Sequence, residues 1–272
     1  MDFSEDQIER YARHILLREV GGRGQEKLLA ARALVIGAGG LGSPVLMYLA
    51  AAGVGTIGVV DDDLVDLSNL QRQIAHATPD IGRPKVESAR DTVRALNPEV
   101  AFITHNERLT AANAAAIIGG YDIVADGSDN FATRFLVNDA CYFARVPLVS
   151  AAILRFDGQV ATFRAFEKFA GGEKKPCYRC LFGSPPPQGT AQTCAEAGVL
   201  GALAGMVGGM QATEVLKELL SIGDSLAGHL VIIDGLNAVF RKIAVKADPG
   251  CPLCGAAAEI HDLSVHATAA KS

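Results

Sequence analysis

Residues 33–42 read Ala33-Leu-Val-Ile-Gly37-Ala-Gly39-Gly40-Leu-Gly42, an apolar run followed by a glycine-rich turn. The apolar run predicts a buried parallel strand, and the glycines fit the G-x-G-x-x-G turn that leads from such a strand into a helix. Backbone amides at this turn can face a phosphate. Glycine turns also serve plain strand-to-helix packing, so the pattern predicts a nucleotide site only together with a suitable carboxylate after the next strand.

A carboxylate ends the next apolar run. This run, Thr56 to Val60, is followed by Asp61, close to the spacing of about twenty residues at which a carboxylate binds a ribose hydroxyl. The alternative is that Asp61, Asp62 and Asp63 are no more than a solvent-exposed end of the strand. We assign Asp61 to the ribose of an adenosine without a 2′-phosphate, Asp63 to a supporting or metal-binding position, and Asp62 to solvent.

Cations follow the same strand. Arg72 lies between Asn69 and Gln73 in one loop, and Lys85 follows shortly after. Arginine offers a planar fork of donors and lysine a point charge, and both suit a triphosphate. A nicotinamide-dependent oxidoreductase would share the glycine turn and Asp61 but does not need this cluster, so it is the weaker alternative for the function. The alternative for Arg72 and Lys85 themselves is that they are ordinary surface cations.

Strand-like and helix-like segments alternate along the first half of the chain. This order predicts an α/β fold, a Rossmann-like doubly wound and largely parallel sheet that continues into an antiparallel half, with an N-terminal helical arm. Ser4 and Gln7 predict a capping box at the start of that arm. We expect one domain with four parts: an arm (1–25), a nucleotide-binding half (33–153), a second half (154–255) and a disordered tail (256–272).

Four of the six cysteines form two C-x-x-C pairs, Cys177 with Cys180 and Cys251 with Cys254. Four thiolates can close a tetrahedral zinc site, which would join two distant segments and contribute folding free energy rather than chemistry. The alternatives are a redox dithiol and a 2Fe-2S cluster. Cys141 is expected in the core, and no ligand spacing is visible among the six histidines.

A further carboxylate follows the strand that begins at Tyr121. Asp129 should lie at the carboxyl edge of the sheet, where open α/β folds bind ligands, and could hold Mg²⁺ beside a phosphate. Its alternative role is to cap the helix that starts near Phe131. Both roles are compatible.

These motifs, in this order, resemble the MoeB/ThiF/HesA family of bacterial relatives of ubiquitin-activating enzymes. The resemblance covers nearly the whole chain. It is carried by Arg10-Tyr11-Ala-Arg13, Gly37 to Gly42, Asp61-Asp-Asp63, Ser68-Asn69-Leu-Gln71-Arg72-Gln73, Lys85, Ser128-Asp129-Asn130, Cys177-Tyr-Arg-Cys180, Thr193-Cys194-Ala-Glu-Ala-Gly198 and Cys251-Pro-Leu-Cys254.

The resemblance implies an adenylyltransferase that uses ATP to adenylate the C-terminal glycine of a ubiquitin-like sulfur-carrier protein ending in Gly-Gly. The role we favour is activation of the molybdopterin-synthase sulfur carrier in molybdenum cofactor biosynthesis. The alternatives are the thiamine sulfur carrier and a carrier for cysteine or tRNA thiolation. A cysteine desulfurase or sulfurtransferase would donate the sulfur. A non-catalytic zinc scaffold would keep the fold without turning over ATP.

The resemblance also implies site residues, and it makes residues 154–255 the carrier-binding half, which contains the zinc site. Arg72, Lys85 and Asp129 act on the phosphates with Mg²⁺, and Arg13 reaches the nucleotide of a neighbouring subunit, which implies a homodimer. The residues that it places around ATP are Gly37, Gly39, Gly40, Gly42, Asp61, Asp63, Ser68, Asn69, Leu70, Gln71, Arg72, Gln73, Lys85, Asp129 and Asn130.

Cys194 is a candidate nucleophile. It follows a proline-rich stretch, residues 182–193, that we expect to be an exposed loop, and it precedes an apolar helix whose N-terminus could lower its pKa. In some relatives the matching cysteine links covalently to the carrier, whereas in others it is not essential. Both interpretations stay open.

Composition limits the partners. The net charge of −5 argues against nucleic acid, and the most apolar run, residues 197–210, is shorter than the roughly twenty residues that span a bilayer. The acidic, polar N-terminus does not have the pattern of a secretory signal. We therefore expect a cytoplasmic protein without a membrane partner.

Overall fold

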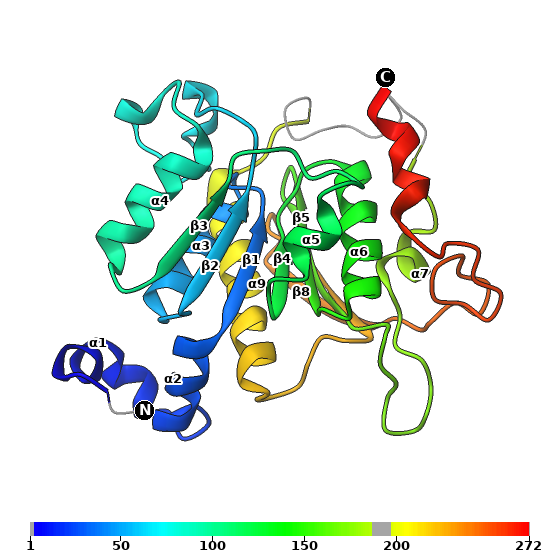
Figure 1. Ribbon diagram of the computed structural model, residues 1–272, viewed down its shortest axis with the longest axis horizontal. Coiled ribbons are helices and arrows are strands. Elements are labelled where there is room, and N and C mark those ends of the chain that lie inside the picture. Colours follow the sequence, from blue (N-terminus) through cyan, green and yellow to red (C-terminus); the bar gives the residue numbers. More distant parts are fainter. Residues whose placement is uncertain (1–2, 187–196, 272) are drawn as a thin grey trace.

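The computed structural model describes residues 3–186 and 197–271. Its described strands form an eight-stranded sheet of order β3-β2-β1-β4-β5-β6-β7-β8 (Figure 1). The strands are β1 (Arg32–Ile36), β2 (Thr56–Val60), β3 (Ala101–His105), β4 (Ile123–Asp126), β5 (Leu148–Leu154), β6 (Asp157–Phe163), β7 (His229–Asp234) and β8 (Val239–Ala244).

The sheet changes from parallel to antiparallel at β5. Strands β3, β2, β1, β4 and β5 run parallel, whereas β6, β7 and β8 each pair antiparallel with the strand before them. The parallel strands are apolar and separated by helical segments, which is the arrangement that covers both faces of a parallel sheet. The predicted α/β fold, with its parallel and antiparallel halves, is confirmed.

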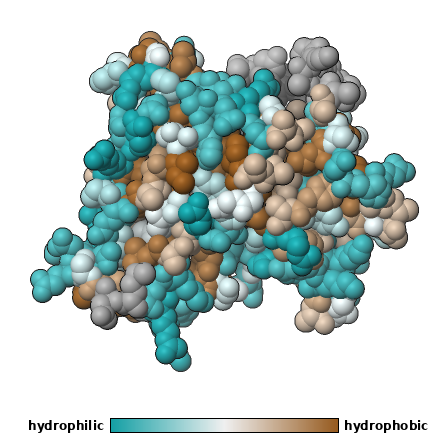
Figure 2. Space-filling view, viewed as in Figure 1, coloured by the Kyte–Doolittle hydropathy of each residue, from teal (hydrophilic) through white to brown (hydrophobic). Residues whose placement is uncertain are grey.

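Helices cover the sheet on two faces. The described α-helices are α1 (Glu5–Ile15), α2 (Gly21–Ala30), α3 (Gly42–Ala51), α4 (Lys85–Leu96), α5 (Ala114–Ile118), α6 (Phe131–Ala144), α7 (Tyr178–Phe182) and α9 (Gly201–Leu220), and the 3₁₀ helices are η1 (Leu67–Asn69), η2 (Thr78–Asp80) and η3 (Leu263–Lys271). One core cluster joins the sheet to α3, α4 and α9, and a second joins it to α5 and α6. In Figure 2, hydrophobic residues gather towards the middle of the face and hydrophilic ones are common around its rim.

Small residues let α9 lie close to α3. A Cβ at Gly208 would come within 2.4 Å of Pro44 Cγ, so only glycine permits this approach. The apolar run that begins at Ala197 thus leads into a helix packed against the sheet, as its composition predicts. Of the described helices, none has the length and apolarity needed to cross a membrane.

The N-terminal arm begins with the predicted capping box between Ser4 and Gln7. Tyr11 is buried, and its hydroxyl accepts a hydrogen bond from Asn97 Nδ2 at 2.9 Å. The next helix, α2, is tied by the Leu28 carbonyl to the Gly55 amide, which lies just before β2. The arm therefore packs at the amino edge of the parallel strands.

Residues 263–271 form η3, although the sequence predicts a disordered tail from residue 256. The reason is a buried acid on α6. Asp139 accepts bonds from both Arg179 Nη2, at 2.6 Å, and His266 Nε2, at 2.8 Å. These contacts lower the pKa of Asp139, outweighing the opposite effect of burial, and they attach the tail segment to α6.

Candidate active site

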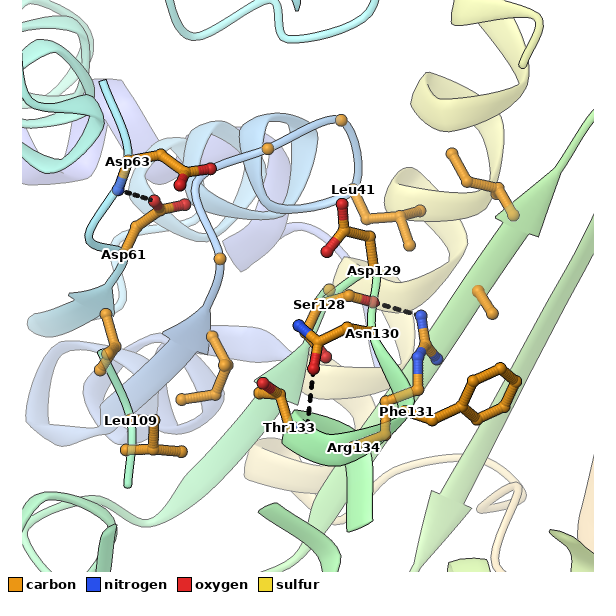
Figure 3. A pocket seen from close by; sticks show the side chains of 18 of the residues that line it. Leu41, Asp61, Asp63, Leu109, Ser128, Asp129, Asn130, Phe131, Thr133 and Arg134 are labelled. Carbon is orange, nitrogen blue, oxygen red and sulfur yellow. Dashed lines mark hydrogen bonds between the residues drawn. The ribbon is translucent and has the colours of Figure 1, made fainter. Parts of the chain in front are cut away.

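A cavity of about 670 Å³ opens at the carboxyl edge of the parallel strands. It lies beside β1 and β4, the point at which the direction of strand addition reverses. β2 pairs with β1 on one side, and β4 pairs with β1 on the other side. Open α/β sheets bind ligands at such a point, because the loops that follow the two strands diverge there. Figure 3 shows Asp61 and Asp63 on one side of this cavity and Asp129 and Asn130 on the other.

The glycine turn after β1 forms one wall. Gly37 has φ of +89°, a left-handed conformation that favours glycine, and a Cβ at Gly42 would come within 1.8 Å of the Gly37 carbonyl oxygen. Gly37, Gly39 and Gly40 line the cavity, whereas Gly42 supports the turn from behind. Within the described chain, the amides of Gly39 and Gly40 donate no hydrogen bond, so both remain available to a ligand.

Asp61 holds the turn in place. One carboxylate oxygen accepts the Ala38 amide at 2.7 Å and the other accepts the Asp63 amide at 2.9 Å. Burial raises the pKa of Asp61, although Lys85 and these amides act in the opposite direction. Asp61 lines the cavity, which agrees with a ribose-binding position, but its contacts in the structure are with the backbone.

Lys85 is the first residue of α4 and lines the cavity. Its side chain is 6% exposed, and its Nζ lies 2.6 Å from a carboxylate oxygen of Asp63, which is 66% exposed. Burial of a lysine is costly unless the ammonium has a partner, so Asp63 accounts for this position. An anionic ligand would meet a cation that is already held in place.

Arg72 also lines the cavity. Its Nη1 donates to the Ser68 carbonyl at 3.1 Å, and its side-chain carbons lie near Gly40. The structure therefore brings Arg72 and the glycine turn together from separate loops. The neighbouring Gln73 is buried and lines the same wall.

The capping role that we considered for Asp129 belongs to Asn130. Asn130 is the N-cap of α6, and its Oδ1 accepts the Thr133 amide at 2.9 Å. Asp129 is exposed, lines the cavity and has no hydrogen-bond or ion-pair partner in the described part of the chain. A free carboxylate at the mouth of the cavity fits the oxygen ligands that Mg²⁺ prefers.

Sequence reasoning missed Arg134. This residue is 7% exposed and lines the cavity, and its guanidinium donates to the Ser128 carbonyl and, at 2.9 Å, to the Ala151 carbonyl. Arg134 therefore fastens the Asp129 loop to β5. Its position four residues after Asn130, one turn along the same helix, was an available signal.

Further lining residues come from segments without a motif. Leu109 follows β3, Tyr178 lies between two of the predicted zinc ligands, and residues 152–154 and 157–159 come from the β5–β6 hairpin. Burial raises the pKa of Tyr178 to about 12, so its hydroxyl stays protonated. The hairpin could not be placed here from the sequence, because only strand pairing brings it to the cavity.

Some predicted residues do not line the cavity. Ser68, Asn69, Leu70 and Gln71 lie in or beside η1, behind Arg72. Arg13 is exposed on α1, in the arm at the opposite edge of the sheet. Cys194, and residues 187–193 of the loop predicted before it, lie outside the described residues.

The four predicted zinc ligands come together away from this cavity. The sulfur atoms of Cys177 and Cys180 are 3.8 Å apart, those of Cys177 and Cys251 3.6 Å, and those of Cys180 and Cys254 3.4 Å. Tetrahedral Zn–S bonds of about 2.3 Å require separations of about 3.8 Å, and a disulfide would require about 2.0 Å. The four thiols are coupled: hydrogen bonds among them lower the pKa of Cys180, to about 7, and of Cys251, and the pKa values of Cys177 and Cys254 are raised.

Comparisons with known proteins agree with one another. The family model described as the ThiF family matches residues 11–253. A sulfur carrier protein adenylyltransferase of Thermus thermophilus is 51% identical over 94% of this chain and 93% of its own length. A SAMP-activating enzyme E1 of Haloferax volcanii is 48% identical over 92% of this chain and 89% of its own.

Among solved structures, MccB of E. coli matches with a TM-score of 0.77 over 93% of this chain and 74% of that one. Its sequence identity is 20%, so this likeness concerns the fold alone.

Proposed function

The chain belongs to the ThiF family, and we propose that it is an adenylyltransferase that activates the C-terminal carboxylate of a ubiquitin-like sulfur-carrier protein. The observation that carries the proposal is the composition of one cavity. Open amides of the glycine turn, the cations Arg72 and Lys85, and the free carboxylate of Asp129 all line it. This set suits a nucleoside triphosphate and an attacking anion.

The reaction joins two anions. A carboxylate oxygen of the carrier attacks the α-phosphorus of ATP, the new P–O bond forms as the bond to the β-phosphate oxygen breaks, and pyrophosphate leaves. The carboxylate is ionised at neutral pH, so no general base is needed. The barrier arises from charge repulsion and orientation, and Arg72 and Lys85 would lower it by fixed positive charge.

Lys85 would change partners during binding. In the structure its ammonium bonds Asp63 at 2.6 Å. A triphosphate beside Lys85 supplies more negative charge than one carboxylate, and Asp63, being exposed, can return to water at little cost. The pair thus holds the lysine side chain in place before the nucleotide arrives.

Asp129 is the residue that would hold Mg²⁺ beside the phosphates. Its carboxylate is exposed to the cavity and free within the described residues, as an ion ligand needs to be. The ion would neutralise part of the negative charge of the phosphates. Asn130 and Arg134 fix the loop on either side of Asp129 by capping α6 and by binding the Ser128 carbonyl.

The carrier's extended Gly-Gly tail would enter along the β5–β6 side of the cavity. That side is lined by residues 152–154 and 157–159 and by Ile232 of β7. Cys194, which lies outside the described residues, would be either a covalent acceptor or a structural residue. After adenylation, a cysteine desulfurase or sulfurtransferase would supply sulfur to the activated glycine.

Two further assignments complete the proposal. Zinc would bind Cys177, Cys180, Cys251 and Cys254 as a closed structural site, because the four sulfur atoms satisfy a tetrahedral shell and leave no open position. Arg13 lies at the edge of the sheet away from its own cavity, so a role at the phosphates requires a second subunit. We therefore propose a homodimer in which each arm completes the partner's site.

The pathway that we favour is activation of the molybdopterin-synthase carrier, in the cytoplasm. The alternative is the thiamine carrier, or a carrier for cysteine or tRNA thiolation. Both classes end in the same chemical group, a glycine carboxylate, and the cavity described above does not distinguish them.

Carrier-dependent ATP–pyrophosphate exchange tests the proposal. Purified, zinc-loaded protein is assayed with the molybdopterin-synthase small subunit, with the thiamine sulfur carrier, and with each carrier lacking its last two residues. Exchange with one full-length carrier and none with its truncated form would support adenylation and identify the pathway. ATP binding without exchange for any carrier would contradict it and favour a scaffold.

A further inference from the structure

His76 is a buried histidine next to the phosphate-binding wall. It is 7% exposed and belongs to the loop that carries Arg72 and Gln73. Both of its ring nitrogens have partners: Nε2 lies 2.8 Å from the Ala38 carbonyl oxygen and Nδ1 lies 2.8 Å from Ser88 Oγ. The ring does not line the cavity, so it acts through other residues.

The partners fix the form of the ring. A carbonyl oxygen only accepts, so Nε2 carries the proton and donates to Ala38; Nδ1 of the neutral ring then accepts from the Ser88 hydroxyl. Burial lowers the pKa of His76, with Lys85 acting in the same direction, and together they outweigh the bond to Ala38 and the charges of Asp61 and Asp80, which act to raise it. The neutral Nε2–H tautomer is therefore the form at neutral pH.

His76 connects two parts of the proposed phosphate site. Ala38 lies in the glycine turn, where its amide donates to Asp61 and its carbonyl accepts from His76. Ser88 lies on α4, three residues after Lys85. The ring thus fixes the distance between the turn that offers Gly39 and Gly40 amides and the helix that offers the lysine.

From this geometry we infer that His76 is a positioning residue for the nucleotide: its bond to the Ala38 carbonyl holds the glycine turn in the conformation that presents its amides to phosphate. The inference rests on the proposed function, because it assumes that a nucleoside triphosphate occupies the cavity. It adds a role for a residue that has no charge at neutral pH and does not line the cavity.

Two amide substitutions test separately the hydrogen bonds made by the two ring nitrogens. In His76→Gln the side-chain amide NH₂ can reach the position of Nε2 and keep the donor to Ala38. In His76→Asn the shorter amide reaches only the position of Nδ1, so it can bond Ser88 but leaves the Ala38 carbonyl without its donor. We expect the Kd for ATP to rise roughly tenfold in His76→Asn and to stay within about threefold of the unchanged protein in His76→Gln.

Thr92→Val is the matched control. Thr92 Oγ1 donates to the Ala75 carbonyl at 2.6 Å, so it is another bond from α4 to the same loop, one residue before His76, but it does not reach the glycine turn. Thr92→Val should lower the melting temperature about as much as His76→Asn. Its Kd for ATP should not change.

The measurement is calorimetric titration of each zinc-loaded protein with Mg·ATP, together with its melting temperature and carrier-dependent exchange. A KM for ATP that rises only in His76→Asn, with the KM for the carrier unchanged, would support the inference. Equal Kd values in His76→Asn and His76→Gln, or an equal loss in Thr92→Val, would overturn it. If His76→Asn does not fold, a tenfold weaker Kd in His76→Gln would overturn it as well.

The same titration separates this inference from the proposed function. If the unchanged protein binds no ATP, the proposed function fails, and the inference fails with it. If the unchanged protein binds ATP and supports exchange while His76→Asn binds equally well, only the role of His76 is wrong.

Discussion

Two carboxylates in the cavity have different roles because different groups surround them. Asp61 accepts two backbone amides, which use one lone pair on each oxygen and fix the glycine turn. Asp129 is free in the described part of the chain, since Asn130 takes the capping role beside it. At the residue scale, a carboxylate that is already bonded positions the site, and a carboxylate without partners is available to a ligand.

Arg72→Ala should abolish exchange while the protein stays folded. Loss of one fixed donor to a developing charge costs roughly a hundredfold in rate, and among the described residues Arg72 donates only to the Ser68 carbonyl, so little stability depends on it. The rate of ATP–pyrophosphate exchange and the zinc content measure the two effects.

Arg83→Ala is the control for that experiment. Arg83 is an exposed cation in the neighbouring loop, paired with Asp80 at 2.5 Å and Asp91 at 2.6 Å, and it does not line the cavity. Exchange in Arg83→Ala should match the unchanged protein. Equal activity of both variants would remove Arg72 from the phosphate site.

Helix termini connect packing with the site at the element scale. α6 begins at the cavity, and its N-cap Asn130 directly follows Asp129. Further along α6, Asp139 binds Arg179 beside the cysteine cluster and His266 of the tail. One helix therefore contacts the cavity, the segment of the cysteine cluster and η3.

Asn130→Ala should destabilise the protein by about 1 kcal/mol, because the Thr133 amide loses its acceptor. Asn130→Asp keeps an oxygen in the same place and should restore most of this stability. The free energy of unfolding in urea measures the difference. Equal stability of the two variants would show that the cap contributes little here.

Acidic pH should weaken the contribution of His76. Burial depresses its pKa in the folded state, so its contribution is complete above the unfolded value of about 6.5 and is lost as the pH falls from there towards the folded value. The stability of the unchanged protein relative to His76→Gln should therefore decrease as the pH falls below about 6.5. A difference that is constant with pH would contradict this prediction.

At the scale of the whole molecule, one sheet connects the nucleotide-binding half to the cysteine cluster. The antiparallel strands continue the parallel ones without a break, and the β5–β6 hairpin contributes to the cavity. The cysteine cluster ties residues 177–180 to residues 251–254, two segments that lie on either side of α9 and the β7–β8 hairpin in the sequence. Closing that long loop should stabilise the antiparallel half.

Removal of zinc should lower the melting temperature and leave the nucleotide half largely folded. The buried Cys251 and Cys254 would become unpaired thiols in a small separate core, whereas the two main core clusters contain neither of them. Chelation followed by thermal unfolding and ATP titration measures both effects. Cys251→Ser should reproduce the result, and a melting temperature independent of metal would contradict a structural zinc site.

Local sequence determined the elements of this protein. The glycine turn, the strand runs, the capping box of α1 and the two C-x-x-C pairs are patterns of neighbouring residues, because backbone conformation and side-chain periodicity are set over a few positions. The fold class follows from their order. Predicted residues that follow β1, β2 and β4, among them Gly39, Asp61 and Asp129, line one cavity because parallel strands end at the same edge.

Tertiary structure alone decided the remaining features. It separated Arg13 from its own cavity, brought Arg134 and the β5–β6 hairpin to the site, placed His76 behind the glycine turn, and ordered the tail on Asp139. Each depends on contacts between residues far apart in the sequence. Such contacts are set by strand order and by the partners that buried polar groups need, and no local pattern records either of them.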